Sequence, residues 1–176
     1  MPTPRIAVRS HRVPANQYRF VTRWLLAATP DELFNVLDHP LDYVRWWPSV
    51  WLRAEEIHRG GADGVGRRVR FHSRGWLPYT LRWTADTVAV SRPTRIAIRA
   101  SGDFEGSGEW TIHAVDASHA EAAYVWTITA GKPLLKYLSP LFRPLFEWNH
   151  RWAMARGEES LRKELKRRAV ERGRAG

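Results

Sequence analysis

The stretch LFEWNHRWAMARGEESLRKELKRR, residues 145–168, decides the fold. At the helical step of about 100° per residue its apolar side chains fall on one stripe, which predicts a long amphipathic helix. The stripe consists of Phe146, His150, Ala153, Met154, Gly157, Leu161 and Leu165. No other segment predicts an element long enough to cover the apolar face of a sheet, so we expect this helix to lie across one.

Upstream of this helix, alternating apolar and polar residues predict six or seven β-strands. The connections are too short for parallel crossovers, so the strands are expected to be antiparallel neighbours. Two short helices follow the first strand, Pro30–Leu37 and Leu41–Trp47, and a capping box at Thr29 and Glu32 begins the earlier one. The predicted strands occupy residues 17–28, 50–59, 67–74, 77–90, 95–100, 104–115 and 122–130.

The chain is expected to form a single α+β domain over residues 17–168, because there are no internal repeats and no second core. Residues 1–16 contain three prolines and no periodicity, which predicts a disordered or loosely attached arm. Residues 132–144 also contain three prolines and are predicted to be irregular or broken helix. Residues 169–176 are predicted to form a basic tail.

The composition excludes several classes of function. The chain has no cysteine, and its seven histidines show no metal-ligand spacing, so we expect neither a metal nor another cofactor. The net charge of +10 comes from the two ends, since residues 24–150 are neutral, and this argues against a dedicated nucleic-acid-binding face. The absence of cysteine and of an apolar leader at the N-terminus favours a cytoplasmic protein.

The order of elements and several short motifs resemble the START-like (helix-grip) superfamily, and within it the SRPBCC proteins of polyketide cyclase/dehydrase type. The resembling motifs are Ala27–Phe34, Asp42–Pro48, Gly64-Val65-Gly66 and the helical segment Asn149–Leu165. The resemblance covers about residues 17–168. It implies a curved antiparallel sheet wrapped around the C-terminal helix, with a hollow interior. It implies no fixed catalytic motif.

Ten tryptophans are an unusual number for a chain of this length. Strand parity places Trp83, Trp110 and Trp126 on the apolar face, where they either line a cavity or fill the core. The implied hollow fold favours a cavity. The residues predicted to contact a ligand are Trp83, Trp110, Trp126, Tyr124, Leu81, Phe71, Trp47, Asn149, His150 and Met154.

His150 is the candidate catalytic residue, because it is a titratable group in the middle of the apolar stripe. It could instead be a core histidine that hydrogen-bonds a neighbouring side chain, and Asn149 could share either role. On the opposite side of the helix, Trp148 and Trp152 predict a face that is covered by the preceding segment, residues 134–146, by a second copy in a homodimer, or by a membrane surface.

Three functions remain open from the sequence. The leading hypothesis is a protein that binds, transports or sequesters a small hydrophobic molecule such as a lipid, a quinone or a polycyclic aromatic. The first alternative is a polyketide cyclase or dehydratase that uses the same cavity and needs no metal or nucleotide. The second is a membrane-peripheral lipid carrier or interaction module, which would place the protein at the inner face of the membrane.

Overall fold

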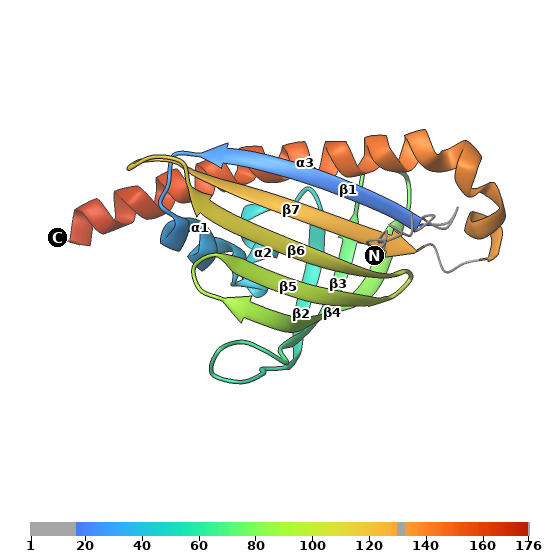
Figure 1. Ribbon diagram of the computed structural model, residues 1–176, viewed down its shortest axis with the longest axis horizontal. Coiled ribbons are helices and arrows are strands. Elements are labelled where there is room, and N and C mark those ends of the chain that lie inside the picture. The colour runs from blue at the N-terminus through green and yellow to red at the C-terminus, as the bar shows by residue number, and fades with distance from the viewer. Residues whose placement is uncertain (1–16, 130–132, 176) are drawn as a thin grey trace, which may run out of the picture.

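The structure is a computed structural model that describes residues 17–129 and 133–175, and the side chains of residues 18–129 and 144–174. Seven antiparallel strands form one curved sheet in the order β1-β7-β6-β5-β4-β3-β2 (Figure 1). This confirms the predicted helix-grip α+β fold. The strands are β1 Gln17–Leu26, β2 Trp51–His58, β3 Arg68–Arg74, β4 Thr80–Ser91, β5 Arg95–Gly102, β6 Glu105–Ala114 and β7 Ala120–Thr129.

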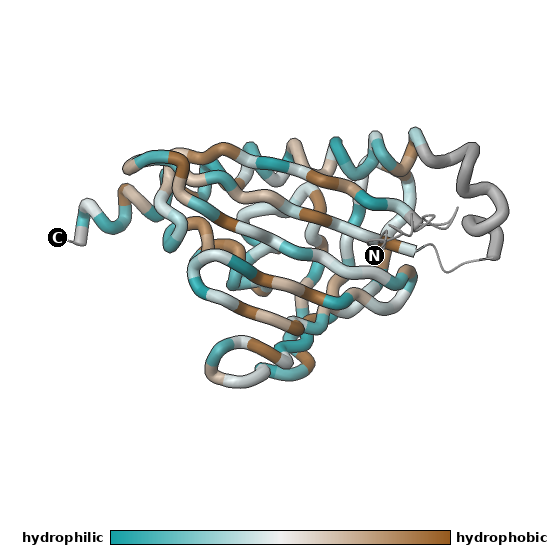
Figure 2. Tube along the Cα trace, in the orientation of Figure 1, coloured by the Kyte–Doolittle hydropathy of each residue, from teal (hydrophilic) through white to brown (hydrophobic). Residues whose placement is uncertain are grey.

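The long helix α3, Pro133–Ala175, bridges parts of the sheet that are far apart in strand order. On the β1 side, the His150 ring lies beside Thr22, and the guanidinium of Arg162 donates to the carbonyl oxygen of Leu25. On the other side, Asn149 accepts from the backbone of Leu77, in the connection between β3 and β4. Hydrophobic and polar residues alternate along the strands (Figure 2), as a sheet with one covered face requires.

The predicted limits of α3 were too narrow. The helix begins at Pro133, where the missing N–H costs nothing because the first turn has no partner for it. Pro140 and Pro144 lie inside the helix, and Figure 1 shows its first turns bending away from the main axis. At the other end the helix continues to Ala175 instead of ending at Arg168. Within residues 17–129 and 133–175, no helix is long and apolar enough to cross a bilayer.

The short helices follow their sequence signals closely. Helix α1 spans Pro30–Leu37 as predicted, and the capping box is complete: the Thr29 hydroxyl accepts from the Glu32 N–H at 3.3 Å, and the Glu32 carboxylate accepts from the Thr29 N–H at 2.8 Å. The predicted second helix is a 3₁₀ turn, η1 Pro40–Asp42, followed by α2 Tyr43–Trp46. The predicted N-terminal arm, residues 1–16, lies outside the described residues.

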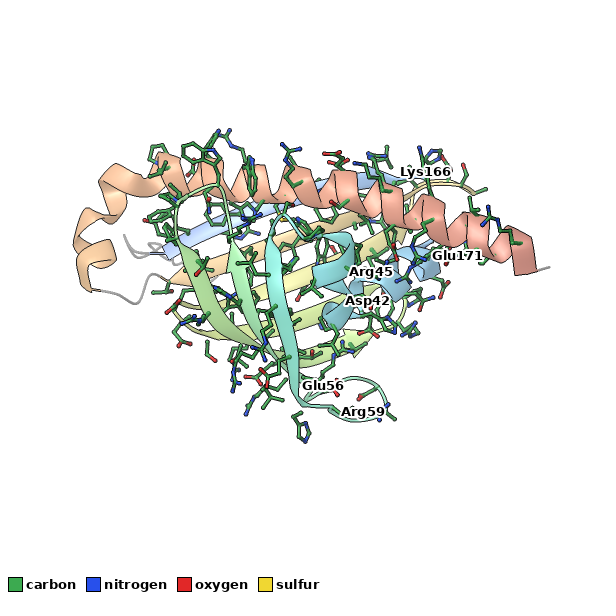
Figure 3. The ribbon with its side chains drawn as sticks, turned by 180° about the vertical axis from the view of Figure 1, so that it is seen from behind. Asp42, Arg45, Glu56, Arg59, Lys166 and Glu171 are labelled. Carbon is green, nitrogen blue, oxygen red and sulfur yellow. The ribbon has the colours of Figure 1, made fainter. Side chains whose placement is uncertain are left out.

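A buried carboxylate joins α2 to α3. Glu164 is 3% exposed and accepts paired hydrogen bonds from Arg45, at 2.8 and 2.9 Å, and from Arg167, at the same two distances. Arg168 adds a bond of 2.7 Å. Burial alone would raise the pKa of Glu164, but the three guanidinium groups outweigh it and hold the pKa far below its usual range. Figure 3 shows Arg45 and Asp42 beside this half of α3.

Candidate ligand-binding cavity

A cavity of about 260 Å³ lies between the concave face of the sheet and α3. Its wall contains all ten residues that the sequence predicted to contact a ligand, from Phe71 and Leu81 on the sheet to Met154 on α3. The structure therefore brings these residues together around one space. Their role in binding stays a prediction.

Aromatic rings form most of this wall. The Trp83 ring packs against Phe104 at 5.3 Å and against Trp126 at 5.7 Å, and the Trp110 ring stacks on Tyr124 at 4.4 Å between centroids. Gly108 makes room for these rings, because a Cβ at this position would lie 2.3 Å from the Tyr124 hydroxyl oxygen. The sheet thus supplies flat apolar surfaces suited to stacking on a planar ligand.

Most polar groups of the wall already have partners within the chain. The Trp83 indole N–H donates to the Ser73 hydroxyl at 3.1 Å, and the Tyr43 hydroxyl donates to the carbonyl oxygen of Leu37 at 2.5 Å. The Arg67 guanidinium binds the Asp38 carboxylate at 2.6 Å, with only 15% of its side chain exposed. These groups shape the wall without requiring a partner from a ligand.

A few polar groups of the wall lack such partners. The buried indole N–H groups of Trp47 and Trp51 have no hydrogen-bond partner among the described residues, and the same holds for Nε of Arg67. The structure also shows no described partner for the Tyr124 hydroxyl, whose pKa is raised by burial and then by neighbouring Tyr43. All four groups can donate a hydrogen bond, so they are matched by an acceptor oxygen.

His150 lies in the wall, but no acidic side chain among the described residues forms a catalytic pair with it. Its ring stacks on Phe20 at 4.4 Å, and its Nε2 lies 3.3 Å from the Thr22 hydroxyl. Burial lowers the pKa of His150 to about 4, so the ring is neutral at pH 7. This geometry is compatible with both roles predicted for His150, a core histidine and a catalytic residue. The ring lies within hydrogen-bond distance of Thr22 and also lines the cavity.

Asn149 connects the helix to the β3–β4 connection. Its side-chain oxygen accepts from the Leu77 N–H at 3.1 Å, and Gly75 packs so closely that a Cβ there would lie 2.1 Å from that oxygen. Asn149 therefore holds residues 75–79 against α3 while it lines the cavity. This positioning role agrees with the predicted alternative of a residue that hydrogen-bonds a neighbouring group of the chain, and the predicted ligand contact stays a prediction.

The structure separates the two tryptophans that the sequence placed on one outward face. Trp148 is 37% exposed and meets Trp76 edge-on at 4.0 Å. Trp152 is half-buried and packs against the core, because α2 approaches this flank of α3, where the Trp47 ring lies over Gly157. The predicted cover comes from residues 134–146, whose side chains lie outside the described set except for residues 144–146.

Sequence reasoning missed many residues of this region, among them Tyr43, Trp51, Arg67 and Trp76. Trp51 was missed because β2 shifts its register between Trp51 and Arg53, which breaks the alternation used to assign faces. Arg67 gave no signal, since an arginine that turns inward to meet Asp38 looks like a surface arginine in the sequence. Within the described residues, no group of three or more histidine and acidic side chains could hold a metal ion.

A curved sheet gripping one long helix around an aromatic cavity defines the class of START-like, helix-grip proteins. The chain belongs to the family described as polyketide cyclase/dehydrase and lipid transport, whose pattern matches residues 17–167. The curated proteins contain no match to the chain.

Solved structures with the same fold carry different activities. The Zhui aromatase/cyclase from Streptomyces sp. R1128 superposes with a TM-score of 0.69 and 20% identity, covering 87% of this chain and 96% of its own. A START superfamily protein from Mycobacterium smegmatis gives 0.69 at 11% identity, covering 85% and 97%. Norcoclaurine synthase from Thalictrum flavum gives 0.57 at 15% identity, covering 85% and 96%. At these identities the likeness concerns the fold alone.

Proposed function

We propose that this protein binds a small, ring-containing hydrophobic molecule that carries at least one acceptor oxygen, such as a quinone or an oxygenated polycyclic aromatic. The observation that carries the proposal is an aromatic cavity whose polar groups are mostly paired within the chain. The remaining donors, on Trp47, Trp51 and Tyr124, suit a carbonyl or phenolic oxygen. Transport and sequestration both follow from such binding. A cytoplasmic location stays a prediction from the sequence.

Titration of delipidated protein with a quinone, a fatty acid and a polycyclic aromatic ketone tests the proposal. We expect the ring-containing ligands to quench tryptophan fluorescence saturably, because Trp83, Trp110 and Trp126 line the cavity. The fatty acid should quench less, since it offers no ring for stacking. Native mass spectrometry of the purified protein gives an independent readout of a co-purifying ligand. Absence of saturable quenching by every compound would contradict the proposal.

A cyclase or dehydratase is the second candidate, favoured by the presence of the neutral His150 and the Tyr124 hydroxyl, a hydrogen-bond donor, in one cavity. In this reading the cavity folds a polyketide-like chain, His150 accepts a proton, and Tyr124 donates a hydrogen bond to a carbonyl oxygen. The family and the likeness to an aromatase/cyclase agree with this reading.

Replacing His150 separates the two candidates. If the protein is an enzyme, His150→Ala should lower turnover of a polyketide substrate at least about 100-fold and leave its binding within a few-fold. Thr22→Val removes only the hydroxyl beside the ring, so it should have a smaller effect. Equal turnover by wild type and His150→Ala would exclude His150 as the general base.

A further inference from the structure

Three large aromatic side chains stand exposed around the β3–β4 connection. Trp76 is 54% exposed, Tyr79 41% and Trp148 37%, and the rings of Trp76 and Trp148 meet edge-on. We call these three side chains the aromatic rim. They come from two elements that Asn149 ties together through the N–H of Leu77, so the rim is a joined surface rather than three isolated side chains.

The cavity reaches the surface at this rim. Tyr79 belongs both to the rim and to the cavity wall, and two further wall residues lie close to it in the sequence, the exposed Arg74 and the half-buried Gly75. Away from the rim, wall residues such as Leu37 and Trp47 are deeply buried, at 2% and 4% exposed. The rim therefore offers a hydrophobic ligand a route into the cavity.

Basic residues flank the rim. Arg74 and Arg151 are exposed on either side of it, and no described acid pairs with Arg151. In the sequence, residues 132–151 contain four basic residues and one acidic residue, Glu147. An anionic surface would complement this arrangement.

We propose that the aromatic rim docks on an anionic lipid bilayer, so that the cavity exchanges its ligand directly with the membrane. Tryptophan and tyrosine suit the headgroup layer, because each combines an apolar ring with one hydrogen-bonding group. Three side chains form a small patch compared with the roughly 800 Å² that each partner of a stable dimer buries. A bilayer is therefore a better match than a second copy. The sequence predicted a docking face made of Trp148 and Trp152. The proposed surface keeps Trp148 but contains Trp76 in place of Trp152.

Flotation with vesicles tests the docking surface. Wild type should float with phosphatidylcholine vesicles that contain phosphatidylglycerol, and less with phosphatidylcholine alone. Trp76→Ser and Trp148→Ser should each weaken binding at least about tenfold, because each removes an exposed ring from the contact. Arg151→Gln should weaken binding about fivefold and reduce its dependence on salt.

Matched controls lie away from the rim. Val115→Ser alters a side chain that is also 54% exposed, in the connection between β6 and β7, and Arg99→Gln removes an exposed cation from β5; neither should change flotation. Thermal unfolding checks that the variants fold. In a titration without vesicles, the rim variants should bind the hydrophobic ligand with the affinity of wild type. The flotation test is therefore independent of the proposed ligand binding.

Two results would overturn the proposal. One is equal flotation by wild type, Trp76→Ser and Trp148→Ser, or no flotation of wild type with either vesicle. The other is a concentration-dependent dimer of wild type that the two tryptophan variants convert to monomer while flotation stays unaffected, since the rim would then bind a second copy.

Discussion

Ala153→Phe should weaken binding of the hydrophobic ligand at least about 100-fold. Ala153 lies on α3 in the cavity wall and is half-buried, so a phenyl group there occupies space that the ligand needs. The cavity has a volume of only about 260 Å³, which leaves little room for a phenyl group and a ligand together. Quenching of tryptophan fluorescence in a ligand titration measures the effect.

Ala155→Phe is the matched control, because it makes the same change two residues away at an exposed position of the same helix. It should bind the ligand like wild type. Overpacking at Ala153 is expected to lower the free energy of unfolding by about 1–3 kcal/mol, so a folded variant remains available for the titration. Equal affinity of both variants would show that the ligand does not occupy this cavity.

Glu164→Gln should lower the free energy of unfolding at pH 7 by about 2–3 kcal/mol, below the full cost of breaking a deeply buried ion pair. The change removes the charge that holds Arg45, Arg167 and Arg168 together, although these partly exposed guanidinium groups can regain water. Urea unfolding measures the difference. Glu159→Gln, which affects an exposed pair with Lys163, should change stability little.

The Glu164 effect should also depend on pH in a defined direction. The pKa of Glu164 is lowered in the folded protein, so its stabilisation is fully present above the pKa of unfolded glutamate, about 4.3. As the pH falls below that value, wild type should lose this stabilisation progressively, and the difference from Glu164→Gln should shrink. A difference that stays constant from pH 7 to pH 3 would contradict the assigned role of the charge.

The sequence predicted those parts of the fold that depend on local chemistry. The capping box at Thr29 gave the limits of α1, and alternation placed Trp83, Trp110 and Trp126 on the concave face, because a strand with one buried face must alternate. The limits of α3 were wrong because Pro140 and Pro144 lie within the helix without ending it, and residues 169–175 contain no proline to end it at Arg168.

The site was predictable only where one strand or one helix determines a residue's direction. Arg67 turns inward because Asp38, 29 residues earlier in the chain, meets it, and no local pattern contains that information. Trp76 lies in a connection without periodicity, so nothing indicated that it would meet Trp148. The residues of the docking surface could therefore be identified only in the structure, whereas the main aromatic residues of the cavity wall could be predicted from the sequence.

The pairing of β1 with β7 has a consequence for how the chain folds. It joins Gln17 to Thr129 and Leu26 to Ala120, so β1 can pair only after β7, the last strand of the sheet, has been synthesised. Such distant pairings slow folding, because the entropic cost of closing a long loop comes before any stabilising contact between the strands forms. We expect β1 to remain unpaired during most of synthesis and the cavity to form last, when α3 packs across the completed sheet.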